Sequence, residues 1–277
     1  MKIQISRLFV LVTMALFVFT ACQKESSEVL STENESIALK TAEDLTTSDN
    51  LFEDISNQAD EQIEEAFMSG KTGEDECVVR TWAAERGTYP NTLTIDYGEG
   101  CEGLNGRVRS GKIIIHLSAE PTESGAIKTV TLENFFINEV QIEGTKTTTN
   151  NGLNELGQPS FSRTAMGTVT FLDGISIEWN VSRTAVQLEG YDTFRRFDDV
   201  FSITGTANGT NRNGVSYVGV IVKPILKKAL CPWAVSGSVE FTINEETRTL
   251  DFGAGDCDRL ATVTNSEGEL KEILLPR

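Results

Sequence analysis

The spacing of hydrophobic residues changes once along the chain, close to residue 77. Between Leu51 and Gly70, apolar side chains recur every three or four residues with acidic side chains between them, which is the period of an amphipathic α-helix. Polar residues just before Leu51 offer N-caps, and Gly70 is a typical helix end. We therefore expect a helix over residues 51–70 that packs on the rest of the protein by its apolar face. That face consists of Leu51, Phe52, Ile55, Ala59, Ile63, Ala66 and Phe67.

From Cys77 onward the period is two. In residues 175–181 and 235–243, apolar and polar side chains alternate, so each segment predicts an antiparallel strand with one buried and one solvated face. Dipeptides that supply the positive φ of tight turns punctuate this region, and about a dozen strands fit before residue 275. The turn dipeptides are Asn105-Gly106, Asp173-Gly174, Asn208-Gly209 and Asn213-Gly214.

No alternation of strands with helices occurs after residue 77, which argues against a parallel sheet. The pattern predicts an all-β body over residues 71–277, built as an antiparallel meander. Two forms hide the apolar face equally well: a sandwich of two packed sheets, and one curled sheet over an apolar groove. The longest break is the Thr-, Asn- and Gly-rich segment 147–162, which we interpret as a surface loop between two halves of the meander.

One stretch of sequence occurs twice. TLTIDYGEGC spans Thr92–Cys101, and TRTLDFGAGDC spans Thr247–Cys257 with one inserted residue. A further cysteine precedes each copy, Cys77 in the first case and Cys231 in the second. The chain therefore holds two related β units, near residues 77–117 and 231–275.

Four cysteines allow three disulfide pairings. The repeat favours the pairing of Cys77 with Cys101 and of Cys231 with Cys257. Zinc is the alternative use of these thiols, but there is no CxxC spacing and His116 lies beside no cysteine.

The first residues predict an address outside the cytoplasm. Lys2 and Arg7 precede an apolar run that is too short to span a membrane. Phe19-Thr20-Ala21-Cys22 resembles a bacterial lipobox, which would make residues 1–21 a lipoprotein signal peptide and Cys22 the lipidated first residue of the mature protein. A plain signal peptide with an incidental cysteine is the alternative. Disulfides form and persist in such oxidising compartments.

Most of the negative charge lies near the N-terminus. The chain carries −17, and residues 23–76 hold 16 acidic and 3 basic side chains, a net −13. Residues 22–50 are rich in Ser, Thr and Glu, so we predict a flexible acidic tether there. The acidic run directly after Cys22 is similar to the export tags that carry such lipoproteins to the cell surface; a solvated linker is the alternative. A chain without a basic patch does not favour nucleic acid as a partner.

The repeated loops are the first candidate site. Asp96 and Glu99 in the first copy, and Asp251, Asp256 and Asp258 in and after the second, gather carboxylates beside glycines, and calcium binds to oxygen ligands of this kind. The competing interpretation is that these side chains accept hydrogen bonds from backbone amides in ordinary turns. The alternate-position spacing of calcium loops is missing from both copies, so the turn interpretation is favoured and no other cofactor is expected.

Signals for catalysis are few. His116 lies in a predicted strand without a neighbouring nucleophile or acid motif, and the sequence contains no G-x-S-x-G, H-E-x-x-H or P-loop. A glycosidase needs only two carboxylates, which no motif search excludes. The aromatic and basic segment with Tyr191, Phe194, Arg195, Arg196 and Phe197 is a candidate contact for an anionic ligand or a polysaccharide, against an ordinary loop.

Three stretches of the body together carry a resemblance: Tyr89 to Thr92, Asp96 to Lys112 with its Asn105-Gly106 turn, and Gly253 to Asp258. The chain resembles the uncharacterised β-rich lipoproteins of the outer membrane and cell surface in Bacteroidetes-type bacteria. The resemblance implies an outer-membrane location on the periplasmic or outer face, and no activity.

The sequence leaves three functions open as hypotheses. The leading one is a non-enzymatic, lipid-anchored protein that binds or scaffolds an envelope protein, lipid or glycan. The second is a carrier of a lipid or other apolar ligand in the groove of a curled sheet. The third is an enzyme acting on polysaccharides.

Overall fold

A computed structural model describes residues 21–68, 77–103, 106–193, 196–265 and 267–275, without the side chains of residues 21–33 and 66–68. The chain divides into two units at Ala38. The helix α1 (Ala21–Met68) begins in the first unit, and the second unit, from Leu39 onward, holds the rest of that helix and the strands. Within the described residues no helix is both long and apolar enough to cross a membrane.

The described strands belong to a single antiparallel sheet. Consecutive strands are neighbours throughout, except that the short β3 pairs only with β4 beside β2, and the sheet is curled and not closed. The predicted all-β meander is confirmed, in its curled-sheet form. The strands are β1 (Val79–Trp82), β2 (Asn91–Asp96), β3 (Cys101–Glu102), β4 (Val108–Leu117), β5 (Ile127–Ile137), β6 (Val140–Leu153), β7 (Pro159–Thr170), β8 (Ser176–Glu189), β9 (Val200–Thr210), β10 (Ser216–Lys228), β11 (Ala234–Ile243), β12 (Glu246–Ala254), β13 (Leu260–Thr264) and β14 (Leu270–Leu274), with a 3₁₀ turn η1 (Arg196–Asp198) before β9.

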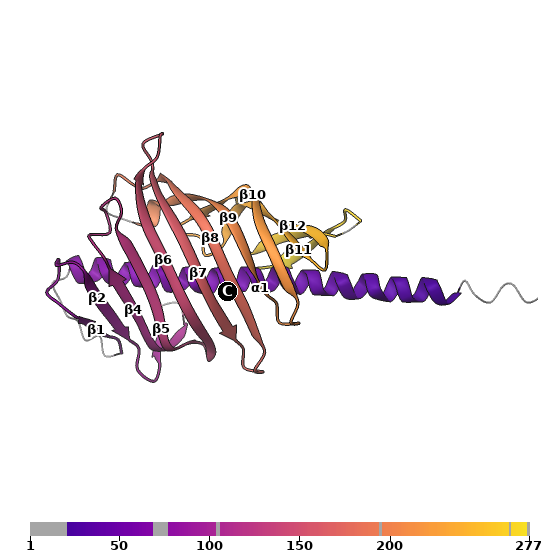
Figure 1. Cartoon of the computed structure of the whole chain (residues 1–277), viewed down its shortest axis with the longest axis horizontal. Coiled ribbons are helices and arrows are strands. Elements are labelled where there is room, and N and C mark those ends of the chain that lie inside the picture. Colours follow the sequence, from indigo (N-terminus) through magenta and orange to yellow (C-terminus); the bar gives the residue numbers. More distant parts are fainter. Residues whose placement is uncertain (1–20, 69–76, 104–105, 194–195, 266, 276–277) are drawn as a thin grey trace, which may run out of the picture. The chain divides into compact units, whose positions relative to one another are not determined.

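The C-terminal part of α1 packs on one face of this sheet and shares its core (Figure 1). Phe52, Ile55, Ala59 and Ile63 are buried, which confirms the predicted apolar face for these four positions. The strands contribute every second residue, as the alternating pattern predicts. From β2, β4, β5, β6, β7 and β8 these are mainly Leu93, Ile95, Ile113, Ile115, Leu117, Val130, Phe135, Ile142, Val169, Ile177 and Trp179.

A pair of glycines makes room for the largest helix side chain. Gly144 on β6 is paired with Gly167 on β7, and a Cβ on Gly167 would lie 2.2 Å from Cζ of Phe52. The Phe52 ring therefore lies over backbone and contacts the indole of Trp179 at 4.7 Å between ring centroids. The close approach of α1 to the sheet depends on these missing side chains.

The helix is longer than the sequence predicts. The expected flexible tether over residues 22–50 and the expected helix start at Leu51 are corrected: α1 runs from Ala21 to Met68, and residues 39–50 lie against the sheet. Ala42 and Leu45 are fully buried there, and Asp44 is 1% exposed. The polar composition of this segment suits a helix because its acidic side chains find cationic partners on the sheet. Residues 69–76, with the expected helix end at Gly70, lie outside the described residues.

Two turn predictions are also corrected. Segment 147–162 is mostly strand, since β6 extends to Leu153 and β7 begins at Pro159, and Asn154 closes the hairpin by accepting hydrogen bonds from the amides of Leu156 and Gln158. Asn208-Gly209 lies inside β9, where the hydroxyl of Tyr217 occupies the space that a side chain at Gly209 would need. Asp173-Gly174 and Asn213-Gly214 form the predicted turns, and Asn105 lies outside the described residues.

Both disulfides have the predicted pairing. Cys77 is bonded to Cys101 and Cys231 to Cys257. The repeated sequence forms β2 with β3 near one edge of the sheet and β12 near the other. Each copy thus closes a covalent loop close to an end of the meander, where fewer neighbouring strands hold the chain.

Candidate functional site

A ladder of ion pairs lines the interface between α1 and the sheet. Seven acidic side chains of α1 each meet a cation from the β body, and the side chain of Asp44 is 1% exposed while that of Arg109 is 3% exposed. Most acidic side chains between the apolar positions of the helix are therefore turned to the protein. The pairs are Asp44 with Arg212, Asp49 with Arg183, Glu53 with Lys146, Asp54 with Arg107 and Arg109, Asp60 with Lys128 and Arg196, Glu64 with Arg196, and Glu65 with Arg80.

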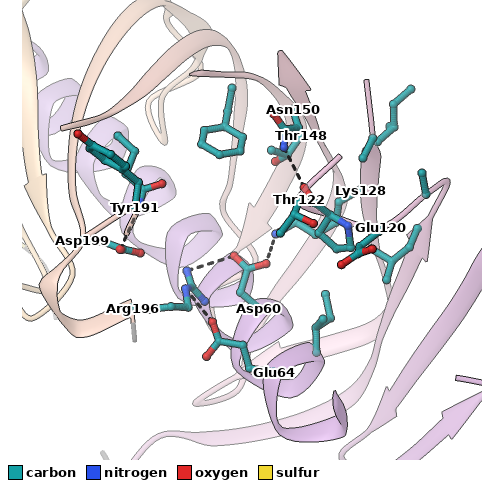
Figure 2. Close-up of a pocket in the computed structure, with 18 of the residues that line it drawn as sticks. Asp60, Glu64, Glu120, Thr122, Lys128, Thr148, Asn150, Tyr191, Arg196 and Asp199 are labelled. Carbon is teal, nitrogen blue, oxygen red and sulfur yellow. Dashed lines mark hydrogen bonds and ion pairs between the residues drawn. The ribbon is translucent and has the colours of Figure 1, made fainter. Parts of the chain in front are cut away.

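Near the C-terminal end of α1 the helix and sheet leave a pocket of about 590 Å³ (Figure 2). Asp60 and Glu64 of α1 lie at its base, with side chains from β5 and β6 on one side and the connection between β8 and β9 on the other. Tyr191 at the rim is 51% exposed. Apolar contacts come from Ile63, Tyr89, Leu117, Ala126, Phe161 and Phe201.

Charges at the base of the pocket are mutually balanced. Asp60 lies between Lys128 and Arg196, 3.2 Å from the Arg196 guanidinium, and Glu64 lies 3.6 Å from Arg196 on its other side (Figure 2). Burial alone would raise the pKa of Asp60, but the attraction of both cations outweighs it and lowers that pKa. Burial dominates for Glu64 and for Asp199, whose pKa values are raised. Asp60 is thus a fixed counter-charge, whereas the other two carboxyls hold protons more readily.

Hydrogen bonds hold the two walls in place. On one side Asn150 of β6 donates from Nδ2 to the carbonyl of Pro121 at 3.0 Å, which fastens the β4–β5 connection. On the other side Gln187 of β8 donates to Asp199 at 2.9 Å. Gly190, with φ of 86°, passes so close to Asp199 that a Cβ would lie 2.4 Å from its carboxylate oxygen. These contacts fix the positions of both walls relative to the strands.

An arginine beside two aromatic rings lines the pocket. The guanidinium of Arg163 on β7 lies 4.9 Å from the ring centroid of Phe201 and 6.0 Å from that of Phe161. The two rings meet edge to face at 6.3 Å. This arrangement places apolar ring surface beside a positive charge.

Three of the five candidate calcium ligands accept hydrogen bonds from backbone amides in turns. Asp96 accepts a hydrogen bond from the amide of Gly98, Asp251 accepts one from Gly253 at the equivalent position of the repeat, and Asp258 accepts one from Leu260. Asp251, Asp256 and Asp258 line a separate cavity of about 150 Å³, away from Asp96 and Glu99. Among the described residues, His, Cys, Asp and Glu form no group of three that could hold a metal ion.

His116 and the aromatic segment have different outcomes. His116 is exposed on the outer face of the sheet, with Nδ1 3.2 Å from the hydroxyl of Thr92. Tyr191 and Arg196 of the predicted aromatic and basic segment line the pocket, whereas Phe194 and Arg195 lie outside the described residues.

Sequence reasoning missed Asp60, Lys128, Phe161, Arg163 and Phe201. A signal existed in β7, where Phe161, Arg163 and Ala165 alternate on the inner face. An arginine at an inward position of a strand marks a charge that the fold must accommodate. Because segment 147–162 was predicted to be a loop, the alternation of inward and outward side chains in β7 did not begin early enough to place Arg163 on the inner face.

Comparison with protein-family models, curated proteins and solved structures found no match to this chain.

Proposed function

We propose that this protein is a non-enzymatic, lipid-anchored envelope protein that binds a small amphipathic ligand in the pocket between α1 and strands β4 to β9. The observation that carries the proposal is the pocket itself: about 590 Å³, lined by apolar side chains together with polar and charged ones, with the half-exposed Tyr191 at its rim. Pockets of about 300–1,000 Å³ with this lining are typical of small-molecule sites.

The size and place of the pocket favour a small ligand over a long lipid. Apolar side chains of α1 share one buried core with strands β2 to β8, so the helix occupies space on the inner face that a long acyl chain would need. Asp60 and Glu64 are ion-paired and Asp199 accepts a hydrogen bond. These contacts support a role in shaping the pocket, and therefore binding over hydrolysis.

The test uses decanol, an uncharged amphiphile, and the mature chain secreted into an oxidising compartment with Cys22→Ser. Calorimetry and native mass spectrometry should show one decanol bound per chain with roughly micromolar affinity. Thr148→Trp, which fills the pocket from β6, should abolish binding. Thr147→Trp is the matched control, because its side chain lies on the opposite face of the same strand. Absence of decanol binding, or equal binding to both variants, would overturn the proposal.

The membrane anchor is a proposal of its own, supported by the lipobox-like Phe19-Thr20-Ala21-Cys22 and by two disulfides, which suit an envelope compartment. Residues 1–20 lie outside the described residues. We expect labelled palmitate to be incorporated into the wild type, which should fractionate with the outer membrane. Cys22→Ser should lose the label and become soluble, and a labelled Cys22→Ser protein would contradict the anchor. Protease treatment of intact cells then distinguishes the two locations: a protein on the cell surface is digested, and one on the periplasmic face is protected.

A further inference from the structure

Arg163 differs from the other cations on the inner face of the sheet. Lys128, Lys146 and Arg183 on that face each bind a carboxylate of α1, as does Arg212 in the β9–β10 turn. Arg163, although on the same face, forms no direct ion pair within the described residues: its guanidinium contacts the rings of Phe161 and Phe201 and interacts with the Glu53 carboxylate only at longer range. Its guanidinium lines the pocket, where its donors remain available to a ligand.

A guanidinium without a direct carboxylate partner, next to aromatic rings, selects for a particular ligand. Its planar fork of N–H donors matches a carboxylate or a phosphate, and Phe161 and Phe201 offer apolar contact beside it. Apart from Arg163, the charged lining consists of four acids and two cations, which leaves a net negative charge: Asp60, Glu64, Glu120 and Asp199 against Lys128 and Arg196. This net charge penalises a ligand with two negative charges more than a ligand with one.

We propose that the pocket binds an amphipathic monocarboxylate, with the carboxylate on Arg163 and the apolar body against Phe161 and Phe201. This inference rests on the proposed function, because it names the ligand class of the same pocket. It adds a negative charge on the ligand and a contact with Arg163. Either of these can be disproved while the pocket still binds amphiphiles.

The experiment compares three ligands with the same tail: decanoate, decanol and decyl phosphate, titrated at pH 7.5 by calorimetry. Decanoate should bind about 10- to 100-fold more tightly than decanol, the value of a charge-assisted hydrogen bond. Decyl phosphate should bind no more tightly than decanoate. Arg163→Gln should remove the preference for decanoate while decanol binding remains. Lys223→Gln, the same change of charge at an exposed lysine of β10 outside the pocket, should leave the preference intact.

The outcomes separate the two proposals. If decanol binds and decanoate binds no better, the carboxylate inference is wrong and the proposed function stands. If decyl phosphate binds best, the ligand class is a phosphate and the inference is overturned. If none of the three binds, the proposed function itself fails. The wild-type comparison needs no variant, so the inference stays testable even if Arg163→Gln does not fold.

Discussion

At the scale of single residues, space matters as much as chemistry. Gly144 and Gly167 carry no side chain where α1 crosses β6 and β7, and Phe52 fills the gap. Gly219 on β10 also faces α1, but a Cβ there would lie at ordinary contact distances, 3.4 Å from Val239 and 3.6 Å from Leu45. Gly167 and Gly219 both lie in strands and both face α1, and they differ in the space available for a side chain.

We therefore expect Gly167→Ala to destabilise the protein by about 1–3 kcal/mol, the cost of overpacking a core. The new methyl group would have to displace the Phe52 ring and the carbonyl of Glu143, which lies 2.5 Å from the ideal Cβ position. Gly219→Ala is the control, and should be neutral or stabilising by about 0.4–1 kcal/mol, because alanine restricts the unfolded chain. Urea unfolding followed by the fluorescence of Trp179, which contacts Phe52, measures both. Equal effects would refute the steric account.

At the scale of elements, α1 is held by charge pairs as well as by its apolar face. A well-buried example is Lys146, whose side chain is 9% exposed and whose Nζ lies 3.1 Å from Glu53. Burial lowers the pKa of Lys146 more than Glu53 raises it. For Glu53, burial alone would raise the pKa, but Lys146 and more distant cations outweigh it and lower that pKa. The two groups thus tolerate burial because they face each other.

Removing one partner should cost more than removing both. We expect Lys146→Met to lower the free energy of unfolding by about 3 kcal/mol, because it leaves Glu53 without its counter-charge. The double variant Glu53→Leu/Lys146→Met should lie within about 1 kcal/mol of the wild type. Lys112→Met, which breaks an exposed pair with Glu133 on the outer face, should have almost no effect. Chemical unfolding of the wild type, Glu53→Leu, Lys146→Met and the double variant completes a double-mutant cycle. If the effects of the two single variants simply add in the double variant, the expected coupling between Glu53 and Lys146 is absent.

The same pair predicts a pH dependence. Because the pKa of Glu53 is lower in the folded protein than its ordinary 4.5, the unfolded chain takes up this proton first as the pH falls. The stabilisation is therefore complete above about pH 5 and is lost progressively below it. Unfolding curves between pH 7 and pH 3 should show a steeper loss for the wild type than for Glu53→Leu/Lys146→Met. Parallel curves would show that Glu53 makes no such contribution.

At the scale of the whole molecule, the two ends of the meander are built alike. Asp96 and Asp251 accept the same turn hydrogen bond, and each precedes a disulfide-bonded cysteine. Between them the strands follow one another without crossing. Such a chain needs an additional element to cover its inner face, and the C-terminal part of α1 does so along β2 to β8. The pocket remains where the β4–β5 and β8–β9 connections close over the last turns of the helix.

Local sequence patterns were sufficient to predict the features that depend on residues close together in the chain: the strands, the disulfides and the inner face of α1. Alternating residues such as Ile177 and Trp179 revealed the strands, because a strand has a period of two wherever one face is buried. The repeat revealed the disulfide partners, because similar sequences close similar loops. The apolar stripe from Phe52 to Ile63 revealed the inner face of α1.

Only the tertiary structure decided the rest. Residues 39–50 resemble a polar tether, since Asp44 and Asp49 look solvated until Arg212 and Arg183 meet them. One curled sheet and two packed sheets bury the same alternating face, so periodicity cannot distinguish them. The pocket joins Asp60, Lys128, Arg163 and Phe201, which lie far apart in the chain. Sequence spacing determines which way a side chain points within its own element, whereas the approach of α1 to the sheet determines which side chains share a site.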